Sequence, residues 1–555
     1  MRPTERIVIG LTVGLLCGEL RAQTSLPSEN TGVSPSAPGT AVSFNLQADQ
    51  PGSLTFFGSE TADLYAKEVN ESFKGALERD YVSHQDGKFP PGFLQASPPP
   101  QPWSGTMWTR DAGVFMRELV FWGYYEHACQ VAQCLMDFAG TNQEGFITFP
   151  ERFSPVDVHK TGTEIDGQCA IIIAMVSLWQ RLPPEHPFRP RLYDFLHRES
   201  SPVRYLHHQL GHEPLIAGSG EFGGGAGVEG LYDNVVQNNL SALALLSAAE
   251  MEEEAGDRAT ARLWHKDANT LFRNVGKYLV DKDGSWIWCI DPKTLKPDPA
   301  VLRNPVNVGS GGLNGVTCMA ADVLGFEPPA WPWRELVVHG EKTFDELYAF
   351  PLRKEQFEKY GFWSQFNVFR GGLNSSPSYG QGYALQTMLL FDKLAMAGHA
   401  LDFLAQATFD SRGVSFSYER LSPYYFYERL YSPDALGKED ATAGCGPLNL
   451  VSVAEPLKVA RLILGVDDTS LKEVRIIPRL SPSWSGCRAE NWPIRTSRGV
   501  VRVDLSFERK NGLTTFSLRV KRGEAIPKLA VCLPLQNKTV WRRQSNVEEI
   551  NLEMR

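Results

Sequence analysis

The feature that most constrains the fold of this chain is a long succession of helix-like segments that ends near residue 466. Apolar residues recur at helical spacing in about twelve segments, and no long strand-rich block interrupts them. Glycine-rich loops separate many of these segments, and no fixed repeat period indicates a solenoid. The pattern predicts a mainly α array with elaborate loops at one end. The expected helices are 61–81, 111–122, 124–139, 166–181, 190–210, 234–255, 258–280, 312–324, 333–348, 378–397, 398–408 and 446–464.

The periodicity changes after residue 466. In VRIIPRLSPSW and GVVRVDLSFERKNGLTTFSLRV, apolar and polar residues alternate as in half-buried strands. Asn511 and Gly512 form a pair that tolerates the positive φ angles of a tight hairpin turn. We therefore expect a helical domain over 59–466 and a small antiparallel, β-sandwich-like domain over 467–555.

The N-terminus has the features of an export signal. Arg2 and Arg6 precede an apolar run, and Ala22 offers a cleavage position. The sequence therefore predicts a signal peptide over 1–22 and a periplasmic or secreted protein. The apolar run is too short to span a membrane comfortably, so we expect no integral membrane segment in the mature chain. Residues 23–58 are rich in Ser, Pro, Thr and Gly, which predicts a flexible leader.

Charge and short motifs exclude several classes of function. The formal net charge is −9 and there is no basic tract, which argues against a nucleic-acid partner. The nine cysteines include no CxxC pair or zinc pattern, and no GxSxG, HExxH or P-loop motif is present. We therefore predict no cofactor and no metal site. Because no helix is an obvious partner surface, we expect a monomer.

A cluster of aromatic and charged residues precedes the 111–122 helix. Trp103 and Trp108 lie in a Gly/Ser/Pro-rich stretch, and Arg110 and Asp111 follow directly. In one interpretation, Asp111 is a simple N-cap of this helix and Arg110 is an ordinary surface charge. The other is a polyol-binding corner, in which an aromatic ring stacks on a sugar face and the Arg/Asp pair binds its hydroxyl groups.

Two further stretches are candidate pocket walls. Tyr379 and Gln381 lie where a Gly-rich turn enters a helix, so they are candidates for stacking and hydroxyl contacts, with simple helix capping as the alternative. Glu164 and Asp166 precede an apolar helix and are candidate sugar contacts, again with capping as the alternative.

The helical array, the WTRD corner and the C-terminal β segment together resemble the six-hairpin glycosidase superfamily, which includes glucoamylases, trehalases, processing glucosidases and rhamnosidases. The resemblance covers roughly residues 60–465. It implies an (α/α)6 barrel whose active site is built from loops at one end. In the glucoamylase branch a Trp/Arg/Asp corner holds the sugar at the cleavage subsite, and Trp108, Arg110 and Asp111 match it. The SPSYGQGY phrase around Tyr379 is not a glucoamylase feature, which suggests a distinct subfamily.

The resemblance also implies the positions of two catalytic carboxylates. The general acid lies in the loop before the 234–255 helix, where Glu221 and Glu229 are the candidates. We favour Glu229, because its neighbours are more apolar and it stands closer to that helix. The general base lies before the last helix, where Glu428 is favoured over Asp440. Hydrolysis with inversion requires one acid and one base separated by roughly 6.5–9.5 Å.

These expectations describe an exported glycoside hydrolase that acts on an oligo- or polysaccharide. A phosphorylase, or a lyase or epimerase centred on Tyr379 or His212, is an alternative on the same barrel. A carbohydrate-binding protein that uses Trp103, Trp108 and Arg110 without turnover is a third.

Overall fold

The computed structural model describes eleven stretches of the chain, and residues 1–43 lie outside them together with ten shorter internal segments. All described residues belong to one compact unit, residues 44–555. Among them, no helix combines the length and apolar character needed to cross a bilayer. The described stretches are 44–101, 103–155, 164–218, 232–287, 289–297, 312–364, 375–376, 378–409, 422–434, 446–535 and 538–555.

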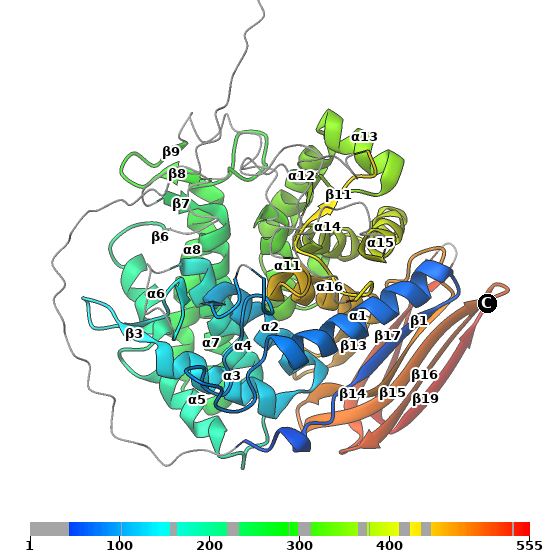
Figure 1. Cartoon of the computed structure of the whole chain (residues 1–555), viewed down its shortest axis with the longest axis horizontal. Coiled ribbons are helices and arrows are strands. Elements are labelled where there is room, and N and C mark those ends of the chain that lie inside the picture. The colour runs from blue at the N-terminus through cyan, green and yellow to red at the C-terminus, as the bar shows by residue number, and fades with distance from the viewer. Residues whose placement is uncertain are drawn as a thin grey trace, which may run out of the picture. The chain divides into compact units, whose positions relative to one another are not determined.

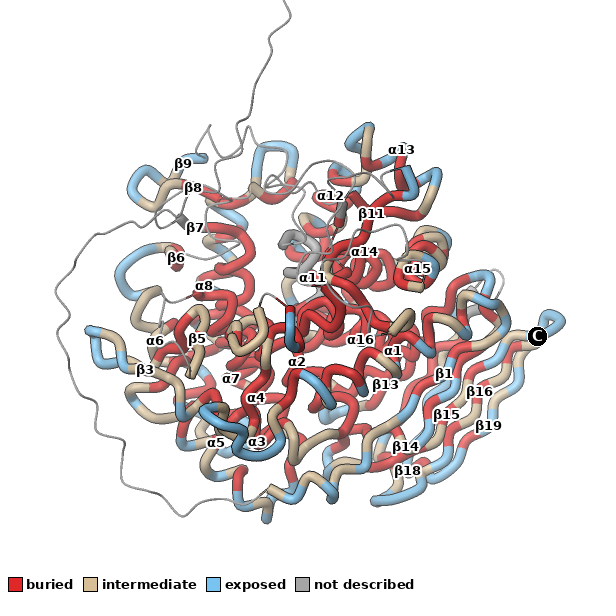
Figure 2. Tube along the Cα trace, in the orientation of Figure 1, coloured by how far each residue is buried: buried red, intermediate tan, exposed pale blue. Residues whose placement is uncertain are grey.

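Six helices of the described chain form a closed inner ring. Each packs against the next, and the last returns to the first. The side chains described on these helices are mostly buried around the whole circumference, as expected for helices enclosed by others (Figure 2). In order, the ring helices are α2 (Thr109–Trp122), α4 (Ile165–Arg181), α7 (Val235–Ala255), α11 (Gly312–Leu324), α14 (Ser378–Leu390) and α16 (Leu450–Leu464).

The helices between them in the sequence lie outside this ring and bury one face. On α8 the buried residues recur at helical spacing, for example Ala261, Trp264, Ala268 and Leu271. This alternation of inner and outer helices is the predicted (α/α)6 architecture. The outer helices are α1 (Glu60–Arg79), α3 (Tyr125–Phe138), α5 (Phe188–His197), α6 (Pro202–Leu210), α8 (Arg258–Tyr278), α12 (Arg334–Ala349), α13 (Pro351–Tyr360) and α15 (Leu394–Phe409).

Two predicted helix boundaries were wrong. The expected helix 190–210 is divided, because Ser201 caps a new helix that begins at Pro202 and Pro fits the first helical position. The expected helix 378–397 ends at Leu390, and Asp392 adopts a positive φ of 54° before α15 begins at Leu394.

Short strands and 3-10 turns decorate the loops. Three of the pairs are two-residue bridges, and a four-stranded ribbon runs β6-β7-β8-β9. The elements are η1 (Leu46–Ala48), β2 (Met107–Trp108), β3 (Gly140–Thr141), β4 (Ile147–Thr148), β5 (Arg152–Phe153), β6 (Ala217–Gly218), β7 (Tyr232–Asn234), β8 (Cys289–Asp291), β9 (Lys296–Pro297), η2 (Pro328–Ala330), β10 (Ser375–Ser376) and β11 (Leu430–Tyr431).

The C-terminal part forms two sheets, seen at the lower right of Figure 1. One has the order β1-β14-β15-β16-β19 and the other β12-β13-β17-β18. Asn511 and Gly512 turn the β15–β16 hairpin with φ of 51° and 75°, which confirms that prediction. The strands are β1 (Ser53–Phe57), β12 (Val466–Asp467), β13 (Val474–Ile476), β14 (Gly486–Thr496), β15 (Gly499–Lys510), β16 (Leu513–Arg522), β17 (Ile526–Leu535), β18 (Lys538–Val547) and β19 (Glu549–Met554).

Two details of the strand pattern differ from the sequence-based expectation. β13 pairs with β17 in parallel, so the β part is not wholly antiparallel. Residues 44–58 of the expected flexible leader are structured: β1 pairs antiparallel with β14, with Leu54 opposite Ala489. The physical reason is that Leu54 and Phe56 are apolar at alternate positions and lie buried in the sheet.

The β part meets the C-terminal ends of the inner helices. Arg181 at the end of α4 donates to Asp468 at 2.6 Å, and Phe326 N, just after α11, donates to Asp467 at 3.0 Å. Gly465, just after α16, accepts a backbone hydrogen bond from Ile477. Because the inner helices are parallel to one another, their N-terminal ends and the preceding loops lie at the opposite end of the barrel.

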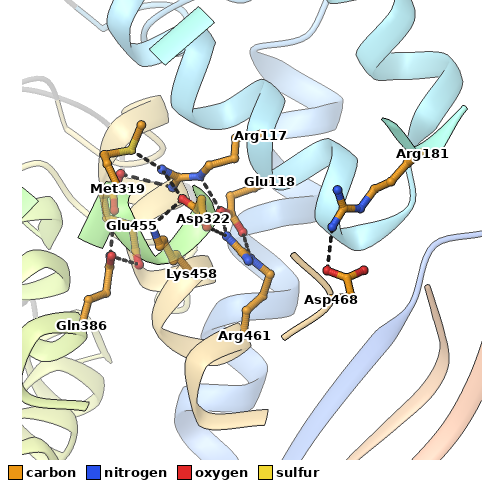
Figure 3. A network of polar contacts seen from close by, with 10 residues as sticks. All are labelled: Arg117, Glu118, Arg181, Met319, Asp322, Gln386, Glu455, Lys458, Arg461 and Asp468. Atoms are coloured by element: carbon orange, nitrogen blue, oxygen red, sulfur yellow. Dashed lines mark hydrogen bonds and ion pairs between the residues drawn. The ribbon is translucent and has the colours of Figure 1, made fainter. Parts of the chain in front are cut away.

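Six charged side chains from three inner helices meet inside the ring (Figure 3). Three are basic and three are acidic, so their charges balance, and each is at most 4% exposed. Gln386 Nε2 on α14 adds a hydrogen bond to Glu455 Oε2 at 2.7 Å. We call this set the buried ionic cluster; it comprises Arg117, Glu118, Asp322, Glu455, Lys458 and Arg461.

Candidate active site

The candidate residues that the structure describes lie at the N-terminal end of the inner ring. They belong to the loop before α2, the first turns of α2, α4 and α14, and the segment before β11. Glu221, Glu229 and Asp440 lie outside the described residues. The six inner helices present their positive ends here, which favours carboxylates at this end of the barrel.

Arg110 is the centre of a carboxylate cluster that joins α2 to α4. Its Nη1 lies 3.5 Å from Glu164 Oε1 and 3.4 Å from Asp166 Oδ2, and its Nε lies 3.7 Å from Asp111 Oδ1. The Arg110 side chain is 12% exposed, and the three carboxylates are 1–7% exposed. In surroundings of low polarity these contacts fix the guanidinium group and strengthen its electrostatic effect.

The close approach of the two helix starts depends on a glycine. A Cβ atom on Gly167 would lie 2.8 Å from Thr109 Oγ1 and 3.3 Å from Arg110 N. Thr109 is itself held, because its hydroxyl donates to Glu151 O at 3.0 Å. Gly167 therefore allows the carboxylates of α4 to reach Arg110.

Helix capping does not account for Asp111 or Glu164, and it accounts for only one oxygen of Asp166. Trp108 is the N-cap of α2, so Asp111 lies inside the first turn. Glu164 is the N-cap residue of α4, but its side chain makes no cap hydrogen bond. Asp166 accepts from Gly167 N at 3.0 Å through Oδ1, while Oδ2 contacts Arg110.

The two tryptophans form an aromatic wall beside this cluster. Their rings pack edge to face at a centroid distance of 5.3 Å, and both side chains are half-buried. Trp108 lies on β2, which pairs with β5, and the guanidinium of Arg152 lies 5.2 Å from its ring centroid. A partly exposed indole wall with an adjacent fixed cation suits the apolar face and hydroxyl groups of a sugar.

On α14 the two candidate residues differ in their surroundings. Both ends of the Gln381 amide are used by Trp363: Gln381 Oε1 accepts from Trp363 N at 3.1 Å, and Nε2 donates to Trp363 O at 2.7 Å. Gln381 is 1% exposed, so its observed role is to hold the 363 segment against α14. Tyr379 is partly exposed and packs against Tyr383 at 6.0 Å.

Tyr383 connects the site to the buried ionic cluster. Burial and the nearby Glu455 raise the pKa of Tyr383, while Arg110 acts in the opposite direction. The phenol is therefore neutral at physiological pH and lies within electrostatic reach of both groups. The sequence signal for it was weak, because a tyrosine in an apolar helix is ordinary core material.

Glu428 is held near the start of α14 by its backbone neighbours. Ser378 Oγ donates to Tyr427 O at 2.6 Å, and β10 pairs with β11 just beyond. Glu428 N donates to Gly446 O at 2.9 Å, which brings it beside the entrance to α16. The carboxylate is 15% exposed and lies 4.0 Å from Arg429 Nη2. It is thus partly solvated, as a base that activates water requires.

The loop that carries Trp103 is fixed to the same entrance. Ala96 O accepts from Leu450 N and from Asn449 Nδ2, both at 3.1 Å. Gly446, with φ of +78°, packs against the Gln101 side chain. The loop around residues 96–101 is thus joined to the segment 446–450 at one end of the barrel.

The stretch that contains Glu221 and Glu229 begins and ends at this end of the barrel. Its described flanks, β6 and β7, pair with each other. A Cβ atom on Gly218 would lie 2.7 Å from Ile165 Cγ1 and from Gln237 Oε1, which places β6 against the starts of α4 and α7.

One group of side chains in the described chain has the composition of a metal site. It comprises His197, Glu252 and Asp257, whose ligand atoms lie within 4.8 Å of one another. Glu252 already accepts from Tyr193 at 2.8 Å and contacts His197 Nδ1 at 3.0 Å, and Asp257 caps α8. These contacts fit a junction between helix ends, at the end of the barrel away from Arg110.

Comparison with known proteins identifies the fold. No protein-family model and no curated protein matches this sequence. The α-L-rhamnosidase of Dictyoglumus thermophilum matches in structure with a TM-score of 0.58 at 10% identity, covering 91% of this chain and 50% of that one. The Streptomyces avermitilis α-L-rhamnosidase complexed with L-rhamnose matches with a TM-score of 0.56 at 12% identity, covering 92% of this chain and 42% of that one. The Aspergillus terreus α-L-rhamnosidase matches with a TM-score of 0.54 at 11% identity, covering 91% of this chain and 50% of that one.

This chain therefore spans half or less of the length of those rhamnosidases. At these identities the likeness concerns the fold alone, which is the (α/α)6 barrel that the sequence resemblance predicted.

Proposed function

We propose that this chain is a glycoside hydrolase whose active site is the Arg110 end of the barrel. The observation that carries the proposal is the Arg110 cluster: a nearly buried arginine among three carboxylates, beside two partly exposed indole rings. A sugar presents an apolar face and several hydroxyl groups, and this combination of groups can bind both. The shared fold with α-L-rhamnosidases adds support by analogy.

The proposed mechanism is hydrolysis with inversion by two carboxylates. Glu428 is the general base, because its partly exposed carboxylate can accept a proton from an attacking water. Glu229 is the general acid, with Glu221 as the alternative, and Asp440 is the alternative base. Arg110 and Asp111 hold the sugar by its hydroxyl groups, so that the bond to be cleaved lies between acid and base. This chemistry requires no cofactor.

The N-terminal sequence supports export, so the proposed substrate is a periplasmic or extracellular oligo- or polysaccharide. α-L-Rhamnosides are the first substrates to test, because three structural matches with TM-scores above 0.5 are α-L-rhamnosidases. Whether the reacting sugar is rhamnose depends on the walls of the pocket, which fold analogy does not transfer.

The test compares wild type, Glu428→Gln and Glu229→Gln on aryl and natural glycosides, with product anomers followed by NMR. We expect each variant to lose at least ~10²-fold in kcat, since acid–base groups contribute about 10²–10⁴-fold, and the wild-type product to be inverted. Glu213→Gln, an exposed glutamate before β6, is the matched control and should retain full activity.

Other outcomes redirect the assignment. Full activity in Glu428→Gln contradicts its role as the general base and makes Asp440 the next residue to substitute. Full activity in Glu229→Gln contradicts its role as the general acid and makes Glu221 the next residue to substitute. Retained anomeric configuration contradicts inversion. Sugar binding without turnover of any glycoside would favour the carbohydrate-binding alternative.

A further inference from the structure

A cavity of about 580 Å³ lies far from the candidate active site, at the end of the barrel that meets the sheets. Its wall combines three parts of the chain: residues 48–50, the start of α3 with the stretch 180–186 at the end of α4 and just beyond it, and the ends of strands β15 and β16. Its volume lies in the range typical of sites for small organic ligands, about 300–1,000 Å³.

Two arginines at paired positions of the neighbouring strands β15 and β16 line this cavity. Arg502 on β15 is directly opposite Arg522 on β16, a like-charge pair that costs stability. Among the described residues, neither forms an ion pair: Arg502 donates to Asn491 O at 3.4 Å, and Arg522 donates to Gln50 Oε1 at 3.2 Å. Arg502 is 8% exposed, and burial lowers its pKa. A buried guanidinium with no carboxylate at ion-pair distance favours an anion from outside.

The carboxylates of the wall are largely committed to other groups. Asp49 Oδ2 lies 2.7 Å from His127 Nδ1, and Asp49 Oδ1 accepts from the backbone N of Glu126 at 2.8 Å at the start of α3. The Glu126 carboxylate lies 3.2 Å from His186 Nε2. Glu185 is exposed to solvent. None of these carboxylates lies within ion-pair distance of Arg502 or Arg522, so in the described chain the arginine pair has no direct counter-ion.

A hydroxyl donor completes the polar wall. The hydroxyl oxygen of Tyr125 is enclosed and has no hydrogen-bond partner among the described residues. Burial raises the pKa of Tyr125 to about 12, although Arg502 and Arg181 act against this, so the hydroxyl keeps its proton. Arg181 is neutralised by Asp468 at 2.6 Å. The phenol is thus a buried donor that lacks an acceptor, and its ring centroid lies 5.4 Å from the Arg502 guanidinium.

We propose that this cavity binds a saccharide unit through its carboxylate, as in a uronic acid. The carboxylate would accept from Arg502 and Arg522, whose planar groups match an oxyanion, while Tyr125 would donate to it or to a ring hydroxyl. A free inorganic anion offers the same oxyanion chemistry but fills little of 580 Å³, and Leu182 and Val500 add apolar wall for a ring. The choice of a saccharide rests on the proposed function.

Binding of D-glucuronate, D-glucose and inorganic sulfate to the full chain tests the proposal by calorimetry and by thermal shift. Glucuronate should bind and raise the Tm, whereas glucose, which lacks the carboxylate, should not. Arg522→Gln should weaken glucuronate binding at least tenfold. Because Arg522 is exposed, this variant should fold normally even if Arg502→Gln does not. Arg519→Gln is the matched control, since Arg519 is an exposed arginine of the same strand outside the cavity.

Equal binding of glucose and glucuronate, or unchanged binding in Arg522→Gln, overturns the proposal. Binding of sulfate but not glucuronate overturns the saccharide assignment. Turnover of neutral aryl glycosides is measured in parallel, and Arg522→Gln should leave it unchanged. If glucuronate binds with the predicted arginine dependence while no glycoside is cleaved, the cavity assignment stands and the hydrolase proposal fails.

Discussion

Glu118 is the residue whose change tests the buried ionic cluster most directly. It is fully buried and accepts three hydrogen bonds, from Arg117 Nε at 3.0 Å and from Arg461 Nε and Nη2 at 2.8 and 2.7 Å. Glu118→Gln keeps the shape but removes one of three negative charges that balance three positive ones. It also turns an amide NH2 toward guanidinium groups that can only donate.

The expected cost is about 3–5 kcal/mol, the usual penalty for leaving a buried charge without its partner. At ~2.1 cal/mol/K per residue, roughly 500 folded residues give an unfolding entropy of about 1 kcal/mol/K, so the Tm should fall by ~3–5 °C. Differential scanning calorimetry measures this fall. Glu508→Gln, on the exposed face of β15, removes the same charge from the surface and should shift the Tm by less than ~1 °C.

A double variant distinguishes the effect of the unbalanced charge from the effect of disrupted packing and hydrogen bonds. Glu118→Gln combined with Arg461→Gln restores the charge balance, so the pair should cost less than the sum of the two single changes. Strict additivity of the two losses, or a Glu118→Gln protein with the wild-type Tm, would refute the view that paired charges stabilise this core.

Three further predictions address single positions. Glu68 is fully buried without a hydrogen-bond partner among the described residues, and burial raises its pKa above the ordinary 4.5. The raised pKa of Glu68 therefore favours folding below pH 4.5, and this contribution to the free energy of unfolding is lost as the pH rises through the pKa of the folded state. Glu68→Gln should thus raise the Tm at pH 8 more than at pH 4. An equal change in Tm at both pH values would contradict this. Gly167→Ala should lower kcat/KM by pushing Thr109 away, and Thr109→Ala, which removes the contacted oxygen, should restore part of the loss. Trp108→Ala should raise KM by about tenfold, equivalent to 1.4 kcal/mol of stacking, whereas Trp108→Phe should retain most of the affinity; equal KM values in both would exclude stacking.

Most of the helices and the β15–β16 hairpin could be predicted from the sequence because their signals are local, although α13 (Pro351–Tyr360) was not expected. Helical periodicity on α8 and the Asn511–Gly512 pair depend on neighbours within a few residues. The same locality explains the errors at helix ends, where Ser201 and Asp392 interrupt an apolar pattern that continues beyond them. The WTRD corner was visible because its residues are consecutive.

What only the tertiary structure decided is which distant residues meet. Glu164 and Asp166 lie more than fifty positions from Arg110, yet α4 brings them to it because Gly167 lets two helix starts touch. Gln381 was a plausible sugar contact until the fold placed Trp363 against both ends of its amide.

The buried ionic cluster shows the same division. Each of its charged residues is an apparent exception in an apolar helix, and only the packing of α2, α11 and α16 against one another brings all six together. Sequence periodicity reports which face of a helix is buried, because that depends on the angle between neighbouring side chains. It does not report the partner, since the partner is set by the packing of whole helices. The sequence therefore determined the elements and the chemistry available, and the closure of the barrel determined the site.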